Sequence, residues 1–321
     1  MSKWVIPPKT GHMDMPSGIY YQTMIGKEIA DRLQKNDVII LPVGSTENHG
    51  PHACSGEDTF LVTRMAEQVA QATGCTVAEP IWYGSHPFHH LGMPGTVVIP
   101  EEDLAAYLRA VIAGFWNSGF RKMIILNGHG QDYVIPLAIH QFGKKYQVPA
   151  ILININWWFV IPEHLRDKAH GGPFDTPFIH ADECETSYAL ALFPEMINQR
   201  YAPSTKPIKI FPDGHVDKSG SAYGLPIPFW QQIGASAIEV VSTPEGVVGN
   251  AKLADPEKAK PGLVAIMDYL ERLIHDILKA YPPGNLPPIE TMSMRDKGLI
   301  EDVITGPLNG GKHIYTLAYP T

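Results

Sequence analysis

The stretch Val38-Ile-Ile-Leu-Pro-Val-Gly-Ser-Thr-Glu47-Asn-His49-Gly-Pro-His52 places a short apolar run directly before a cluster of polar side chains. The run itself, residues 38–43, is almost entirely aliphatic, which is typical of a strand buried on both faces. Similar runs recur at residues 76–81, 122–126 and 150–155. These four segments predict the strands of one sheet.

Longer stretches between these runs carry apolar residues at helical spacing, so one face of each could pack on a sheet. The clearest examples are Leu61, Met65 and Val69, then Leu104, Leu108, Ile112 and Phe115, and a final helix at residues 263–278. Strands that alternate with helices predict an α/β fold with a mainly parallel central sheet and helices on both faces. We expect a single domain over residues 1–280, with long loops at residues 202–260, and a C-terminal extension at residues 281–321.

The composition limits the partners of this chain. Its 321 residues are 44% hydrophobic, enough for a sizeable core, and its formal net charge of -8 argues against binding to nucleic acid or an anionic membrane. No apolar stretch approaches the roughly 18 residues of a membrane span. Three scattered cysteines predict neither a disulfide framework nor a thiolate metal site. We therefore expect a cytoplasmic protein that acts on a small molecule.

The first polar cluster combines Glu47 and His49 with Asp58 a short distance further along the chain. A carboxylate, an imidazole and a second carboxylate that follow one strand form a ligand set that zinc, manganese or iron(II) accepts. The alternative is a solvated turn in which Asp58 or Thr59 caps a helix that begins near Phe60. The first cluster alone leaves both interpretations open.

Two further clusters follow. Asn127-Gly-His129 comes directly after a predicted strand, where a lone histidine is often only a hydrogen-bonded scaffold residue. His180-Ala-Asp-Glu183-Cys-Glu185-Thr-Ser leads into an apolar helical stretch. On a helix, Glu183 and Glu185 would point about 200° apart, so only one of them would face a metal.

Together these motifs resemble the creatininase family, whose members carry Gly-Ser-x-Glu-x-His-Gly-Pro-His, a later Asp, Asn-Gly-His and His-x-x-x-x-Glu-Thr-Ser in this order. The resemblance implies a sheet covered on both faces, hexamers, and two divalent metals (Zn, Mn or Fe) bridged by an Asp and a water or hydroxide. It places Glu47 and His129 in one site, His49 in the other, Asp58 between them, and His180 as the acid/base residue.

Two departures from creatininase proper affect the remaining residues. A metal-binding Glu of that enzyme is replaced here by Gln131, and many relatives that lack it carry a Glu three residues after the catalytic histidine, where this chain has Glu183. We therefore predict Glu183 as the missing metal ligand, with Glu185 in a structural role. We assign His90, Gln131 and Trp157 to substrate binding, because they match or lie near positions around the family's substrate.

The resemblance implies a hydrolase in which a metal-bridging hydroxide attacks a carbonyl and opens a small cyclic substrate. Branches of the family open formamides, cleave a peptide or break a ring carbon–carbon bond in an oxidised inositol. Because the histidine-rich loop at residues 85–90 suits hydroxyl groups, we favour an oxidised cyclic polyol such as an inosose-type diketone. The alternatives are an amidohydrolase or deformylase that cleaves a C–N bond, and a binding protein that has kept the fold without activity.

Overall fold

The computed structural model describes residues 18–85, 92–146, 148–206, 245–287 and 314–317, the last of these as backbone only. Its centre is one parallel sheet with the strand order β2-β1-β3-β4-β5. The strands are β1 (Val38–Val43), β2 (Thr76–Val77), β3 (Lys122–Asn127), β4 (Ala150–Asn156) and β5 (Ile314–Leu317). The described helices are α1 (Gly26–Leu33), α2 (Glu57–Thr73), α3 (Glu101–Ser118), α4 (Val134–Tyr146), α5 (Trp157–Val160), α6 (Glu183–Leu192) and α8 (Pro256–Ala280).

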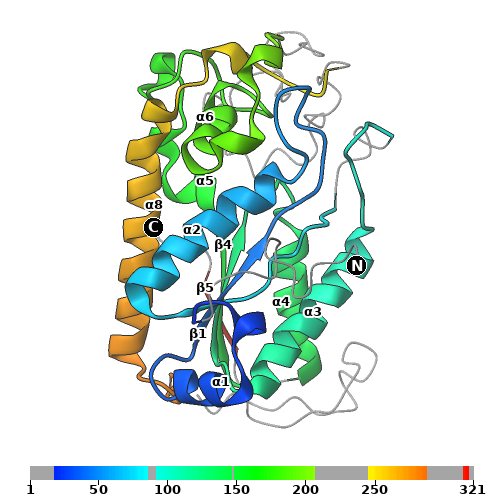
Figure 1. Cartoon of the computed structure of the whole chain (residues 1–321). Coiled ribbons are helices and arrows are strands. Elements are labelled where there is room, and N and C mark those ends of the chain that lie inside the picture. Colours follow the sequence, from blue (N-terminus) through cyan, green and yellow to red (C-terminus); the bar gives the residue numbers. More distant parts are fainter. Residues whose placement is uncertain (1–17, 86–91, 147, 207–244, 288–313, 318–321) are drawn as a thin grey trace, which may run out of the picture.

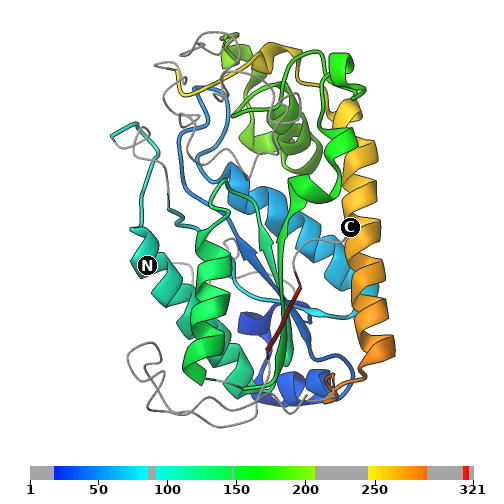
Figure 2. The same cartoon turned by 180° about the vertical axis from the view of Figure 1, so that it is seen from behind.

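Successive side chains of a strand point to opposite faces, and both faces of this sheet are covered. Val38 and Ile40 of β1 pack in a core with apolar residues of α2, α6 and α8. Ile39 and Leu41 pack in a second core with α3 and α4. Figures 1 and 2 show α2 and α8 on one side of the sheet and α3 and α4 on the other. The predicted doubly covered α/β fold is therefore confirmed.

Some element boundaries differ from those predicted. The run at residues 76–81 forms only a two-residue strand, because Pro80 interrupts it, although Ile81 still bridges Val43. The helix predicted from residue 263 begins at Pro256, where Asp255 caps it by accepting from the N–H of Glu257. Helix α4 was not predicted at all.

The C-terminal segment contributes to the sheet. Residues 314–317 pair in parallel with residues 150–153 of β4. Part of the predicted extension thus adds a strand to one edge of the sheet, while the domain boundary after residue 280 stays a prediction. Residues 288–313 and 318–321 lie outside the described residues, as do 207–244 in the predicted loop region.

The carboxyl ends of the three central strands are in register. Val43 lies opposite Asn127, and Asn127 lies opposite Asn156. The loops that leave β1, β3 and β4 therefore start at one edge of the sheet, which is where α/β folds gather their ligand-binding residues. None of the described helices is long and apolar enough to cross a membrane.

Candidate metal centre

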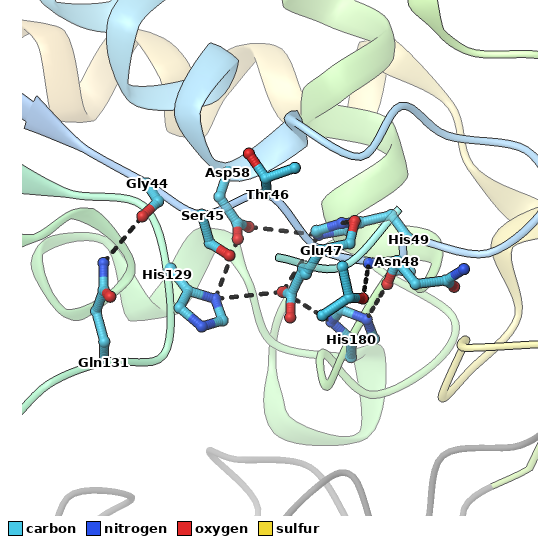
Figure 3. Close-up of polar contacts among 12 residues, drawn as sticks. Gly44, Ser45, Thr46, Glu47, Asn48, His49, Asp58, His129, Gln131 and His180 are labelled. Atoms are coloured by element: carbon cyan, nitrogen blue, oxygen red, sulfur yellow. Dashed lines mark hydrogen bonds and ion pairs between the residues drawn. The ribbon is translucent and has the colours of Figure 1, made fainter. Parts of the chain in front are cut away.

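Three loops and two helix N-termini bring six buried side chains together above this edge, and Figure 3 labels all of them except Glu185. Glu47 and His49 come from the loop after β1, and His129 from the loop after β3. Two carboxylates come from first helical turns, and His180 comes from the loop that precedes α6. The six residues are Glu47, His49, Asp58, His129, His180 and Glu185, none of them more than 7% exposed.

Asp58 lies between two groups of possible metal ligands. Its Oδ2 lies 3.0 Å from Nδ1 of His129, and that nitrogen lies 3.2 Å from Oε1 of Glu47. Its Oδ1 lies 3.3 Å from Nε2 of His49, which is 3.9 Å from Oε2 of Glu185. The ligand atoms of Glu47, Asp58 and His129 all lie within 4.8 Å of one another, and so do those of His49, Asp58 and Glu185.

Backbone carbonyls orient the histidine rings. Nδ1 of His49 lies 3.2 Å from the carbonyl oxygen of Glu47, and Nε2 of His129 lies 3.1 Å from that of Ser85. Because a carbonyl can only accept, these nitrogens donate, and in a neutral ring the second nitrogen has its lone pair free for a metal ion that the neighbouring carboxylates would also bind. Metal-ligating histidines are oriented in this way.

Two buried atoms of the cluster, Nε2 of His49 and Oδ2 of Asp58, have no hydrogen-bond partner among the described residues. Buried polar atoms of this kind require an explanation, and a bound ion is one. Imidazole nitrogens together with carboxylate oxygens are the donors that zinc and manganese accept in proteins. These residues therefore fit divalent metals.

The electrostatics of the cluster also favour cations. Burial by itself would lower the pKa of His49, but the carboxylates of Asp58 and Glu57 raise it well above its usual value. Burial also lowers the pKa of His129, but the carboxylates of Glu47 and Asp58 have the larger combined effect. The pKa of His129 is therefore raised well above its usual value. Burial raises the pKa of Glu185 far above that of an ordinary glutamate. The cluster thus has an excess of negative charge in a site with little water to screen it.

His180 lies at the edge of the cluster. Its Nε2 lies 3.0 Å from the carbonyl oxygen of Asn48, while its Nδ1 faces Oε1 of Glu47 at 3.8 Å and Oε2 of Glu185 at 4.0 Å. The ring is thus oriented by the backbone, with one nitrogen directed at the centre. Glu47, His49 and His180 also form a third group of closely spaced ligand atoms, so geometry alone permits His180 as a ligand.

Glu183 and Glu185 have different surroundings in the structure. Glu183 is fully buried, and its carboxylate accepts from the backbone N–H groups of Asp175 and Thr176 and from the ammonium group of Lys258. Glu185, two residues further along the helix, is the one that faces His49. The two side chains diverge, as expected, but it is Glu185 and not Glu183 that belongs to a group of closely spaced ligand atoms. This geometry favours Glu185 as the metal ligand over the predicted Glu183.

Gln131 and Trp157, two of the residues predicted to bind substrate, are buried and contact other parts of the fold. The amide of Gln131 donates to the carbonyl of Gly44 at 3.0 Å and to Oδ1 of Asn127 at 3.3 Å, and it accepts from the N–H of Ser85 at 3.0 Å. It joins these loops, and Figure 3 shows its contact with Gly44 to one side of the cluster. Trp157 is 1% exposed in the core against Tyr188. Both side chains are buried among described residues, His90 lies outside the described residues, and the assignment of all three to substrate binding stays a prediction.

The helix-cap alternative for Asp58 is also corrected. Helix α2 begins at Glu57 after the N-cap Gly56, so Asp58 lies inside the first turn with its side chain in the cluster. Glu57 itself was missed by the sequence argument. Its side chain is buried, neither oxygen has a hydrogen-bond partner among the described residues, and burial raises its pKa to about 7.

Three supporting polar residues received no role from the sequence. Asn127 donates to the carbonyl of His129 at 2.6 Å and to Oδ1 of Asn156 at 3.0 Å, which ties the His129 loop to the end of β4. Nε2 of His52 lies 2.9 Å from the hydroxyl of Thr186 and connects the first cluster to α6. An Asn that ends each of two adjacent buried strands was a signal available in the sequence.

Comparisons with known proteins agree with this fold. Residues 22–274 match the family described as "Creatininase: Creatinine amidohydrolase". The chain is 58% identical over 305 residues to the 3-dehydro-scyllo-inosose hydrolase of Thermotoga maritima, covering 95% of this chain and 98% of that protein. A crystal structure of creatinine amidohydrolase superposes with a TM-score of 0.65 at 21% identity, covering 84% of this chain and all of that one. One described as "Creatininase Mn" gives 0.64 at 22% identity, covering 83% and 100%.

A doubly covered parallel sheet with a buried His, Asp and Glu cluster at its carboxyl edge is the arrangement of an α/β protein that can bind metals. The family match identifies it as a metal-dependent hydrolase. The family match over most of the chain makes this specific: the chain belongs to the creatininase family.

Proposed function

We propose that this enzyme opens the ring of an oxidised cyclic polyol, an inosose-type diketone, by hydrolysis of a carbon–carbon bond. The observation that carries the substrate is the 58% identity, over nearly the full length of both chains, to a 3-dehydro-scyllo-inosose hydrolase. Identity at this level along the whole chain favours a shared substrate class over the amide substrates of more distant relatives.

We propose two divalent metals, zinc or manganese, in the two ligand groups that share Asp58. Glu47 and His129 would complete one site, and His49 and Glu185 the other. A solved creatininase that is described with manganese supports this choice of metals. When bound, a metal pair lowers the pKa of a shared water towards neutrality and polarises the carbonyl group under attack.

The residues of the protein would then transfer protons during the reaction. Nδ1 of His180 faces the carboxylates at the centre, so it is placed to accept a proton from the attacking water and later to return it. Water adds to one ring carbonyl, and the bond to the adjacent carbon breaks with its electron pair on that carbon. A second carbonyl group in the ring spreads the resulting negative charge, and the proton from His180 quenches it. The products are a carboxylate and a C–H bond within one opened chain.

The direct test is to incubate the purified, metal-loaded enzyme with 3-dehydro-scyllo-inosose, creatinine and a formamide, and to follow each by mass spectrometry. We expect a mass gain of one water for the inosose only. Hydrolysis of creatinine or of the formamide in its place would instead support the amidohydrolase alternative, and would refute the carbon–carbon reaction.

We also propose a cytoplasmic homo-oligomer. The cysteine pattern supports a reducing compartment, and the resemblance to the creatininase family supports a hexamer. Light scattering should give a mass several times that of the 35.4 kDa chain. A mass of one chain at working concentration would refute the oligomer.

A further inference from the structure

The loop before α6 is fastened to the first turn of that helix by Glu183. Its carboxylate is fully buried and accepts from the N–H of Asp175 at 3.0 Å and from the N–H and hydroxyl of Thr176 at 2.8 and 2.7 Å. It also accepts from Nζ of Lys258, on α8, at 2.5 Å. Lys258 in turn contacts Asp175 at 2.7 Å. The loop is therefore held from two directions, by the start of α6 and by α8.

The contacts around the Glu183 carboxylate should be rigid. A buried carboxylate is costly unless it is paired and hydrogen-bonded, so each of the donors around Glu183 is needed to offset its desolvation. Charge-assisted hydrogen bonds are also shorter and stronger than neutral ones. The backbone at residues 175–176 consequently has little freedom relative to α6.

This fixed point lies only four residues before His180. The next residue, Ala181, has a φ of 48°, in the left-handed region that residues other than glycine seldom adopt. Strained backbone of this kind persists where the surroundings determine it strongly. Ala181 donates its N–H to Oε2 of Glu185 at 2.5 Å, and Ile179 donates its N–H to Asp182. The backbone on both sides of His180 is thus held in place by hydrogen bonds.

We propose that Glu183 is a positioning residue for His180. It holds the loop so that Nδ1 of His180 faces Glu47 and Glu185 at about the distances seen here, and it contacts neither metal nor substrate. This inference rests on the proposed role of His180 as the acid/base residue. A displacement of about 1 Å of a reacting group can cost about a hundredfold in rate, so loosening the loop should act on turnover.

A double-mutant cycle separates positioning from general stabilisation. The variants are Glu183→Gln, His180→Ala and the two combined, each measured for kcat, KM and metal content. If Glu183 acts through His180, Glu183→Gln alone should lower kcat by about 10- to 100-fold while KM and metal content stay unchanged. In the His180→Ala background the same change should have no further effect, because the group that it positions is absent.

The control is Glu257→Gln, which breaks the exposed pair between Glu257 and Lys260 one residue away from Lys258 on the same helix. It should leave kcat unchanged in both backgrounds. Should Glu183→Gln fail to fold, Thr176→Val removes only one donor, and the same cycle applies with a smaller expected loss.

Equal losses of kcat in the wild-type and His180→Ala backgrounds would overturn the inference, because they would show a merely structural effect. Loss of a metal in Glu183→Gln would also overturn it. A wild-type enzyme that hydrolyses none of the candidate substrates would refute the proposed function itself, and the inference with it. If the wild-type enzyme is active and the effects of Glu183→Gln and His180→Ala on kcat are independent, only the inference about Glu183 is refuted.

Discussion

At the scale of single residues, the sequence predicts which residue types could bind a metal, but not towards which part of the structure each side chain points. Glu47, His49, Asp58 and His129 were all predicted, and the structure brings them together in the cluster. The choice between two glutamates depends on where α6 begins and on which partners the other glutamate finds. Those partners, in Glu183's case Lys258 and a backbone turn, come from segments whose proximity only the fold reveals.

Replacement of His180 by Ala should lower turnover by about a hundredfold or more, because general acid/base catalysis contributes a factor of about 10² to 10⁴. Metal content should stay unchanged, since the role proposed for His180 is proton transfer. Steady-state kinetics and elemental analysis of the same preparation measure both quantities. A variant that retains full turnover would contradict this role, and a variant that loses a metal would make His180 a ligand.

The two glutamates of α6 should respond differently to the same change. Glu185→Gln should empty one metal site, because a neutral amide oxygen is a weaker donor than a carboxylate to a divalent ion. Glu183→Gln should keep both metals. The two variants serve as matched controls for each other, being the same substitution two residues apart on one buried turn. A metal lost from Glu183→Gln but not from Glu185→Gln would reverse the assignment.

At the scale of elements, apolar runs predicted β1 to β4, because burial on both faces leaves continuous apolar sequence, and helical spacing predicted α2, α3 and α8. Strand β5 and helix α1 were not predicted. Helix α4 was missed although five of its residues are buried, since the glycines and polar residues before it resemble a loop. The ends of elements were less predictable than their existence. They depend on caps such as Asp255 and on breaks such as Pro80.

The amino end of the sheet depends on one buried ion pair. Lys122 on β3 is fully buried, and its ammonium lies 2.6 Å from both carboxylate oxygens of Asp37. Asp37 also accepts from the N–H of Gly284, after the end of α8. Lys122→Met should lower the free energy of unfolding by about 3–5 kcal/mol, because it leaves a buried carboxylate without its partner.

Denaturant unfolding of Lys122→Met measures this loss. The double variant Lys122→Met with Asp37→Leu should recover much of it, since no charge is then left buried. The exposed pair of Lys27 with Asp31 offers a control, and Lys27→Met should cost far less. An equal loss for Lys27→Met and Lys122→Met would contradict the account of the buried pair.

At the scale of the whole molecule, the fold gathers an excess of buried acids at one edge of its sheet. Three loops, after β1, after β3 and before α6, and the first turns of α2 and α6 supply the site. Because these loops are far apart in sequence, no single motif identified the site. Glu47, Asp58 and Glu185 lie against histidine nitrogens of the same cluster. Two bound divalent cations would account for them together.

The metal content of the wild-type enzyme, purified without chelator, tests this claim most directly. Elemental analysis should find close to two zinc or manganese ions per 35.4 kDa chain. Asp58→Asn should lose both, because that carboxylate belongs to both ligand groups. A fully active enzyme with no more than one metal per chain would contradict the dinuclear site.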